Sequence, residues 1–505
     1  MRKILLLLIS FISFSSFSAI RYVTVTGAGS MNGSSWANAF PASSLQTAIT
    51  GAALGDQVWV AAGTYFTTTG TNRTISFSMR NDITIYGSFI GTETLLSQRD
   101  LTNGLTSILS AEIGVAGIAD NSYHVISNFN INNTAVIDGF IIRGANDDRP
   151  AAGDEGLGGG FYNNGSNGNT CSPIIRNCAI LNNQAVFGAG IFNNGYNNGN
   201  ASPLILNCVI AYNTATSGGG GIDNFGIANG NASPTITNSI IYENTAAFRA
   251  GAMYCWGGNT GNTSPVILNS AFVNNHAVDG GGVVADNTNT SSGNSGVSNP
   301  TFRNSIVWGN TITGTGPQFF ILGTGTVSST YTDIDLTNQN APHVLSGVTT
   351  GNLNVNPQFM NIALGVGADT KWFTADDGLQ LIGAASPCYD AGNNTGVPAT
   401  DLLFRNRIVN GTVDMGAYEF DASLATDTFA TTKLTLYPNP TKEVINFSGL
   451  GDGNHTVKIY NMLGMVVKHS MVSNNLIAIN DLESGMYILH LESGYGKSVH
   501  RIVKD

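Results

Sequence analysis

The chain has 505 residues, of which 42% are hydrophobic and only 10% are charged, and its net charge is −11 at pH 7. Lys371 is the only lysine between Arg21 and Phe420. A surface so poor in basic side chains excludes nucleic acid as a partner and does not suit a polyanionic glycan. The length allows one extended domain followed by a small second one.

The N-terminus has the order of features that is typical of a secretory signal peptide. Residues 1–3 carry positive charge, residues 4–14 form an apolar run, and small residues follow at positions 18 and 19. The apolar run is too short to span a bilayer, and no other segment of the sequence could span one. We therefore predict a signal peptide over residues 1–19 and no transmembrane segment.

The middle of the chain contains a repeat in which an asparagine stands four residues after a proline and a second asparagine follows six residues later. The first column consists of Asn177, Asn207, Asn238, Asn269 and Asn304, and the second of Asn183, Asn213, Asn244, Asn275 and Asn310. The copies are short, β-rich and bounded by Gly, Asn, Ser and Pro, and they lack a 3.6-residue apolar stripe. This pattern favours a β-solenoid over a helical repeat. We predict an all-β fold in which residues 20–420 form a parallel β-helix with three short strands per turn.

Turns that stack at the strand spacing place equivalent residues directly above one another. The predicted apolar core column is Ile175, Ile205, Ile236, Ile267 and Phe302. The asparagine columns are expected at bends, where buried amides bond the backbone and the amides of neighbouring turns. Cys178 and Cys208 occupy one ladder position in adjacent turns, which allows either a disulfide or two stacked buried thiols.

A short helix is predicted ahead of the repeats. Leu45, Ala48, Ile49 and Ala52 fall on one helical face after a pair of serines. This helix would cover the open end of the first turn, which would otherwise present unpaired strand edges.

Several motifs outside the repeats resemble a known group of proteins. They are Gly33-Ser-Ser-Trp-Ala-Asn-Ala-Phe, Leu45-Gln-Thr-Ala-Ile, Gly55-Asp-Gln-Val-Trp-Val-Ala-Ala-Gly-Thr-Tyr, Ser386-Pro-Cys-Tyr-Asp-Ala-Gly and Asp414-Met-Gly-Ala-Tyr-Glu-Phe. With the Gly-rich and Ser-Pro repeats, these motifs resemble the extracellular right-handed parallel β-helices of the pectin-lyase-like superfamily, in the branch with varied C-terminal surface anchors. The resemblance implies the fold, but it implies no activity, since this fold hosts lyases, hydrolases, adhesins and stalks.

The composition and the hydrophobic pattern of the chain change after Phe420. Residues 421–433 form a polar linker, and residues 434–505 alternate like a small immunoglobulin-like β-sandwich. Four motifs occur here in order: Leu436-Tyr-Pro-Asn-Pro-Thr, Ile459-Tyr-Asn-Met-Leu-Gly, Leu482-Glu-Ser-Gly-Met-Tyr-Ile-Leu and Lys497-Ser-Val-His-Arg-Ile-Val-Lys.

These four motifs resemble the type A C-terminal sorting domain of the type IX secretion system of Bacteroidetes. The residues that match the sorting motifs are Tyr437, Pro438, Asn439, Pro440, Gly464, Gly485, Tyr487, Lys497 and Arg501. The resemblance implies the type IX machinery as a partner. It also implies export through the periplasm to the outer-membrane surface or the extracellular space.

The strands that follow the glycine-rich turns predict a ligand site. Because side chains alternate along a strand, Tyr162, Phe192, Asp223 and Tyr254 should point outward from four consecutive turns. An aromatic stripe with one carboxylate is suited to stacking against sugar rings and accepting their hydroxyl groups, which predicts a groove for a neutral glycan. The alternative is that the long Asn- and Gly-rich loops fold over these rings and bury them.

Two acidic segments are candidates for oxygen ligands. Asp369, Asp376 and Asp377 form one cluster that could hold calcium, although no EF-hand pattern is present. The alternative for this segment is a structural role in closing the C-terminal end of the solenoid. The other cluster is the acidic loop that contains Asp147, Asp148, Asp154 and Glu155, which could hold calcium or paired carboxylates or could be an ordinary solvated loop. No cofactor is required by any of these motifs.

The sequence favours a monomeric, non-catalytic adhesion, glycan-binding or structural module at the cell surface or in the medium. The alternative is a polysaccharide lyase or glycoside hydrolase that acts on an extracellular polysaccharide. A lyase would need a base and a cation from Arg143, Arg149, Arg249 or His276. A hydrolase would need two carboxylates across the sugar, yet no repeat supplies a paired acidic column.

Overall fold

A computed structural model describes residues 18–288, 296–337, 339, 349–421, 435–448, 455–461, 465–493 and 496–505. The chain divides into two compact units, Met1–Phe420 and Asp421–Asp505. Most of the predicted signal peptide and linker, and Gly464, lie outside the described residues.

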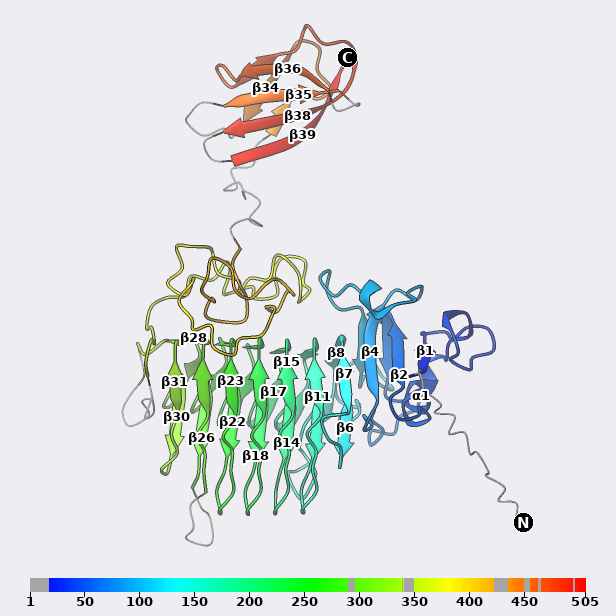
Figure 1. The fold of residues 1–505 in the computed structure, drawn as a ribbon, viewed down its shortest axis with the longest axis vertical. Helices are drawn as coiled ribbons and strands as arrows, with labels where there is room; N and C mark the ends of the chain where they lie inside the picture. Colours follow the sequence, from blue (N-terminus) through cyan, green and yellow to red (C-terminus); the bar gives the residue numbers. More distant parts are fainter. Residues whose placement is uncertain are drawn as a thin grey trace, which may run out of the picture. The chain divides into compact units, whose positions relative to one another are not determined.

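The first unit is a right-handed parallel β-helix, which confirms the predicted fold class (Figure 1). Its strands stack into four parallel sheets, which we number 1 to 4 in the order in which one turn visits them. Sheet 1 contains β1 (Ile20–Val23), β2 (Gln57–Ala61), β4 (Thr84–Phe89), β7 (Val136–Asp138), β11 (Ile174–Arg176), β15 (Leu204–Leu206), β19 (Thr235–Thr237), β23 (Val266–Leu268), β27 (Thr301–Arg303) and β31 (Ser328–Thr330). Sheet 2 contains β3 (Gly63–Phe66), β5 (Ser107–Ser110), β8 (Phe140–Arg143), β12 (Ala179–Leu181), β16 (Val209–Ala211), β20 (Ile240–Tyr242), β24 (Ala271–Val273), β28 (Ile306–Trp308) and β32 (Asp333–Ile334).

The prediction of three strands per turn is wrong, because each repeated turn contributes one strand to each of four sheets. Sheet 3 contains β9 (Asn146–Asp147), β13 (Gln184–Phe187), β17 (Thr214–Gly218), β21 (Thr245–Ala246), β25 (His276–Ala277) and β29 (Thr311–Ile312). Sheet 4 contains β6 (Ile126–Phe129), β10 (Phe161–Asn164), β14 (Ile191–Asn194), β18 (Ile222–Phe225), β22 (Met253–Trp256), β26 (Val283–Asp286) and β30 (Phe319–Leu322). The strands of sheet 3 are as short as two residues, too short to show an alternating pattern in the sequence.

The predicted apolar column forms the core of the solenoid. Ile175 pairs in register with Ile205, and the ladder continues through Ile236 and Ile267 to Phe302, each at most 2% exposed. The cysteines in the adjoining column are free and buried, so the stacked-thiol alternative holds for Cys178 and Cys208.

Both predicted asparagine columns lie at bends between sheets. The first column adopts left-handed backbone conformations, with φ between 48° and 53°, which asparagine tolerates better than most residues. The second column forms a continuous ladder of side-chain amides inside the solenoid. For example, Asn213 Nδ2 donates to Asn244 Oδ1 at 2.9 Å, and Asn244 Nδ2 donates to Asn275 Oδ1 at 3.0 Å.

A third amide ladder, which sequence reasoning missed, runs inside sheet 4. Asn128 donates to Asn163, Asn163 to Asn193 and Asn193 to Asn224, at 2.9 to 3.0 Å. The regular spacing of these asparagines could have predicted the ladder from the sequence. The asparagine repeat ends at the next turn, however, where Cys255 occupies the equivalent position.

The N-terminal end is covered as predicted. Helix α1 (Leu45–Thr50) follows the 3-10 turn η2 (Ala42–Ser44) and buries Leu45, Ala48 and Ile49 against the first core residues. The Ser44 side chain makes no cap hydrogen bond. Two further 3-10 turns, η1 (Trp36–Asn38) and η3 (Leu96–Gln98), lie in the first part of the solenoid.

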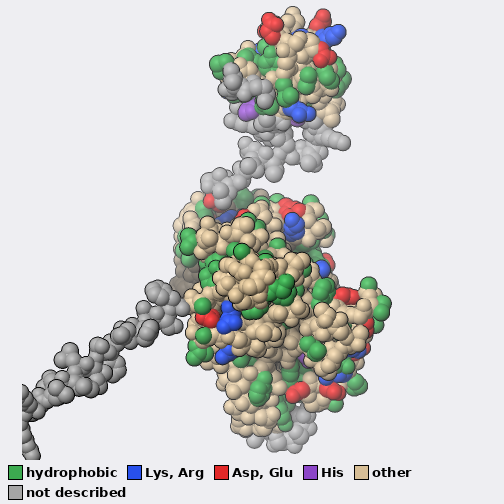
Figure 2. Space-filling view, turned by 90° about the vertical axis from the view of Figure 1, so that its right-hand side faces the viewer, with side chains coloured by type: hydrophobic (Ala, Val, Ile, Leu, Met, Phe, Trp, Pro, Cys, Tyr) green, Lys and Arg blue, Asp and Glu red, His purple; other side chains and the backbone are tan. Residues whose placement is uncertain are grey.

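Leu353 pairs in parallel with Asp333 and so continues sheet 2 past β32. The role in closing the C-terminal end that was expected for the segment with Asp369, Asp376 and Asp377 is corrected, because residues 359–420 run along the flank of the solenoid (Figure 1). They pack on the outer face of sheet 2. Tyr242 on β20 donates from its hydroxyl to the carbonyl of Ile362 at 2.9 Å, and its ring lies 5.8 Å from that of Trp372. On the face in Figure 2, charged side chains are scattered and Lys and Arg form no concentrated patch on the solenoid.

The second unit contains two antiparallel sheets around one core, as in a β-sandwich. One sheet contains β33 (Thr435–Tyr437), β34 (Val444–Ser448) and β37 (Leu476–Ala478). The other contains β36 (Val466–Met471), β35 (Thr456–Tyr460), β38 (Gly485–Ser493) and β39 (Gly496–Lys504). Ile445, Ile459 and Ile502 are buried between them.

The sorting-motif residues lie at the ends and edges of these strands. Asn439 donates to the carbonyl of Arg501 at 2.9 Å and accepts from the amide of Val503 at 2.8 Å, so the N-terminal motif is fastened to the C-terminal strand. Gly485 begins β38, and the Tyr487 hydroxyl donates to the carbonyl of Glu483 at 2.8 Å. The side chain of Lys497 lies outside the described residues.

Candidate functional site

The predicted stripe lies on the outer face of sheet 4. Tyr162, Phe192, Asp223 and Tyr254 pair in register on β10, β14, β18 and β22. All four side chains are buried, and Asp223 is only 2% exposed. Loops and neighbouring rings therefore cover the stripe, so that it is not an open flat face.

A cleft of about 570 Å³ remains above the middle of this stripe. It is lined by Ala151, Ala152, Gly153, Asp154, Leu157, Ser166, Asn167, Phe187, Phe192, Asn194, Tyr196, Asp223, Phe225, Tyr254 and Trp256. Three residues of the stripe are in this lining, whereas Tyr162 is not. None of these lining residues is Lys, Arg or His.

Phe225 and Trp256 are cleft residues that sequence reasoning missed. They stand two positions after Asp223 and Tyr254 and therefore point to the same outward side of β18 and β22. The Phe225 and Trp256 rings meet edge to face at 5.2 Å, and the Trp256 ring lies 9° from parallel to that of Tyr254. Extending the two-residue alternation by one step would have found both.

Tyr254 is held in place from outside the cleft. Its hydroxyl donates to Asp286 at 2.9 Å, and that carboxylate also accepts from the amide and hydroxyl of Thr288. Arg249 lies 3.9 Å from the same carboxylate. The polar end of Tyr254 is thus satisfied by Asp286.

Tyr162 marks the end of the stripe beneath the acidic loop. Its hydroxyl donates to Asp154 at 2.6 Å and accepts from Asn194 at 3.1 Å, while its ring stacks on His124 at 5.4 Å. Burial lowers the pKa of His124. Asp154 is therefore a rim residue of the cleft with a structural hydrogen bond.

The predicted calcium ligands Asp369, Asp376 and Asp377 do not come together in the described structure. Asp376 accepts from the amides of Ala368 and Asp369 in an exposed turn. Asp377 points inward and accepts from the Tyr418 hydroxyl at 2.7 Å.

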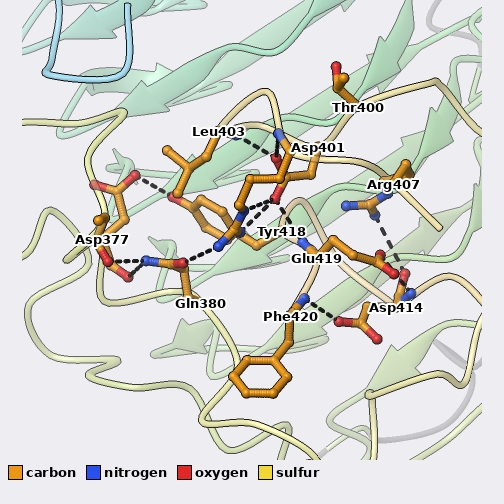
Figure 3. A network of polar contacts seen from close by, with 12 residues as sticks. Asp377, Gln380, Thr400, Asp401, Leu403, Arg407, Asp414, Tyr418, Glu419 and Phe420 are labelled. Carbon is orange, nitrogen blue, oxygen red and sulfur yellow. Dashed lines mark hydrogen bonds and ion pairs between the residues drawn. The ribbon is translucent and has the colours of Figure 1, made fainter. Parts of the chain in front are cut away.

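Another acidic group, formed by Asp390, Asp414 and Glu419, lies in the same flanking segment. Their ligand atoms lie within 4.8 Å of one another. Figure 3 shows Asp414 and Glu419. Each of the last two carboxylates accepts two backbone amides, and burial raises their pKa values to about 6 for Asp414 and about 8 for Glu419. These acids hold the irregular segment together from inside.

The stability of the solenoid is expected to fall as the pH rises from about 4 to about 7. Burial raises the pKa of Asp377 from 3.8 to about 7. The unfolded chain loses this proton near pH 4 and the folded chain keeps it, so between these values the folded state binds more protons and is destabilised by rising pH. Urea unfolding at several pH values measures the slope.

The variant Asp377→Asn tests this explanation. One side-chain oxygen of Asp377 serves Tyr418 and the Phe373 amide, whereas the other has no hydrogen-bond partner among the described atoms. The amide should therefore fit and stabilise the protein at pH 8 by about 1 kcal/mol or more, because one pKa unit corresponds to about 1.4 kcal/mol. An unchanged pH slope in this variant would contradict the assignment.

Comparison with known proteins identifies the class of the second unit. Residues 435–505 match the family model described as "Secretion system C-terminal sorting domain". This confirms the interpretation drawn from the four motifs, and a type IX sorting domain implies export to the cell surface or the extracellular space.

The chain is similar in structure to a solved protein. The crystal structure of pectate lyase Pel9A aligns with a TM-score of 0.39 and 14% sequence identity, over 80% of this chain and 97% of that chain. Comparison with curated proteins gives no match. Among the described residues, no helix has the length and apolarity needed to cross a membrane.

Proposed function

We propose that the exported solenoid is a non-catalytic glycan-binding module and that a sugar ring occupies the cleft on β14, β18 and β22. The observation that carries this proposal is the combination of aromatic rings and two carboxyl groups, Asp154 and Asp223, in a single cleft of about 570 Å³. Ligand sites of this size use apolar walls with a few polar groups that fix orientation. The faces of Phe225, Tyr254 and Trp256 suit stacking on the apolar faces of a sugar.

The charges of the cleft support binding over the lyase alternative. A lyase must neutralise a uronate carboxylate and remove the adjacent proton, which requires a cation and a base. The residues that line the cleft include no Lys, Arg or His, and Arg149 is paired with Asp147 at 2.7 Å. The hydrolase alternative would require Asp154 and Asp223 as acid and base, but Asp154 is already bonded to Tyr162.

Replacing a cleft ring is expected to weaken glycan retention. Trp256→Ala and Tyr254→Ala should each reduce the affinity for a glycan that binds the native protein by about tenfold or more, equivalent to about 1.4 kcal/mol of lost stacking. Glycan arrays identify the ligand, and calorimetry with the purified protein measures the change.

Phe129→Ala is the matched control for this test. Phe129 ends β6 at the strand position equivalent to Trp256, is 60% exposed and does not line the cleft. Unchanged retention by both cleft variants would refute the site. Newly formed reducing or unsaturated ends in the same incubations would favour an enzyme instead.

A further inference from the structure

Asp223 is the unusual residue of the cleft. It lies at the centre of the floor, in register between Phe192 and Tyr254, and is 2% exposed. None of the described residues donates a hydrogen bond to its carboxyl group or forms an ion pair with it, and burial alone raises its pKa well above the ordinary value. A buried carboxyl group without a partner is costly, so it requires an explanation.

Asp286, a second buried acid on the outer face of sheet 4, provides an internal comparison. It is also 2% exposed, yet it accepts hydrogen bonds from Tyr254 and Thr288 and lies 3.9 Å from Arg249. The fold therefore supplies partners to the buried acid on β26 and none to the buried acid on β18. The cleft, onto which Asp223 faces, is the side from which a partner can reach it.

The surroundings of Asp223 select the charge of that partner. The cleft contains a second acid, Asp154, and no basic side chain among its lining residues, so an anionic group is repelled. The rings of Phe225, Tyr254 and Trp256 present electron-rich faces that attract cations. A neutral hydroxyl group would not stabilise the ionised form of this carboxyl group, whereas a cation would.

We propose that the group bound at Asp223 is a protonated amine and that the cleft selects an amino sugar with a free ammonium group. The ammonium group donates to the Asp223 carboxylate while the sugar ring stacks on Trp256 or Tyr254. This inference rests on the proposed glycan-binding function and narrows the ligand to a cationic glycan, in place of the neutral glycan expected from the sequence.

Three tetrasaccharides that differ only at carbon 2 test the selection. They are the β-1,4-linked tetramers of glucosamine, N-acetylglucosamine and glucose. The native protein is expected to bind the glucosamine tetramer at least tenfold more tightly than either of the others at neutral pH, as measured by calorimetry.

Asp223→Asn keeps the shape of the side chain and removes its charge. The tenfold preference should disappear in this variant, while its affinity for the glucose tetramer stays within threefold of the native value. Glu155→Gln is the matched control, because this acid lies in the adjoining loop outside the cleft lining, is half exposed and should leave the preference unchanged when its charge is removed. Thermal unfolding should show Asp223→Asn to be at least as stable as the native protein, since an unpaired buried acid is removed.

The outcomes separate this inference from the function on which it rests. Equal binding of the three tetramers, or a preference that survives in Asp223→Asn, overturns the ammonium site and leaves glycan binding intact. Binding of none of the three also overturns the inference, and the ring variants then decide independently whether the cleft binds another glycan.

Discussion

Deletion of residues 435–505 is expected to abolish the appearance of the protein at the cell surface and in the medium and to leave the solenoid in the periplasm. The deleted unit is the sorting domain, and it has a hydrophobic core of its own. The solenoid also keeps its core, so loss of export would not result from unfolding. Cell fractionation and protease accessibility of intact cells measure the distribution.

The matched control for the deletion transfers residues 421–505 to a periplasmic reporter protein. Export of the reporter is expected, because the transferred residues contain the sorting domain. Thermal unfolding of the truncated chain should resemble that of the solenoid in the full protein. Normal display of the truncated chain would contradict the role of the domain.

Asn244→Leu is expected to lower the free energy of unfolding by roughly 3 kcal/mol or more, although it adds apolar surface. Asn244 donates to the carbonyl of Ile210 at 2.8 Å and to Asn275, and its oxygen accepts from both the amide and the side chain of Asn213. Leucine would leave these buried groups unpaired at about 1–3 kcal/mol each. Since whole domains are stable by about 5–15 kcal/mol, the loss should be large in urea unfolding.

Asn133→Leu is the control for the asparagine ladder. Asn133 is exposed and outside the amide columns, so its replacement should change the free energy of unfolding by less than about 0.5 kcal/mol. A similar small effect at Asn244 would mean that the amide ladder does not stabilise the solenoid.

The parts of the fold that recur were predictable from the sequence. Because each turn repeats the same contacts, Ile236 and Asn244 could be assigned to the core and the ladder from spacing alone. The flanking segment could not be placed this way, because its contacts join residues far apart in the chain. The bond from Tyr242 to Ile362 spans 120 residues and has no periodic signal.

The cleft was predictable only in part. Register and alternation put Phe192, Asp223 and Tyr254 on one face, and the structure places all three around one cavity. The depth of the cleft depends on the loop before β10, whose conformation no repeat determines. Asp154 in the same loop bonds to the Tyr162 hydroxyl group, and Tyr162 does not line the cleft.

The flanking segment changes how the solenoid resists unwinding. In a linear repeat protein each turn contacts only its neighbours, so the terminal turns can fray one at a time. Here Asn238 and Asn304, on different turns, donate to the carbonyls of Thr400 and Asn393. The segment thus connects several turns of the solenoid from outside, and these turns must lose their contacts with the segment before they can separate from one another. The turns that the segment contacts should therefore unfold together in one cooperative transition. The cleft, which lies on sheet 4 of the solenoid, should keep its shape until that transition.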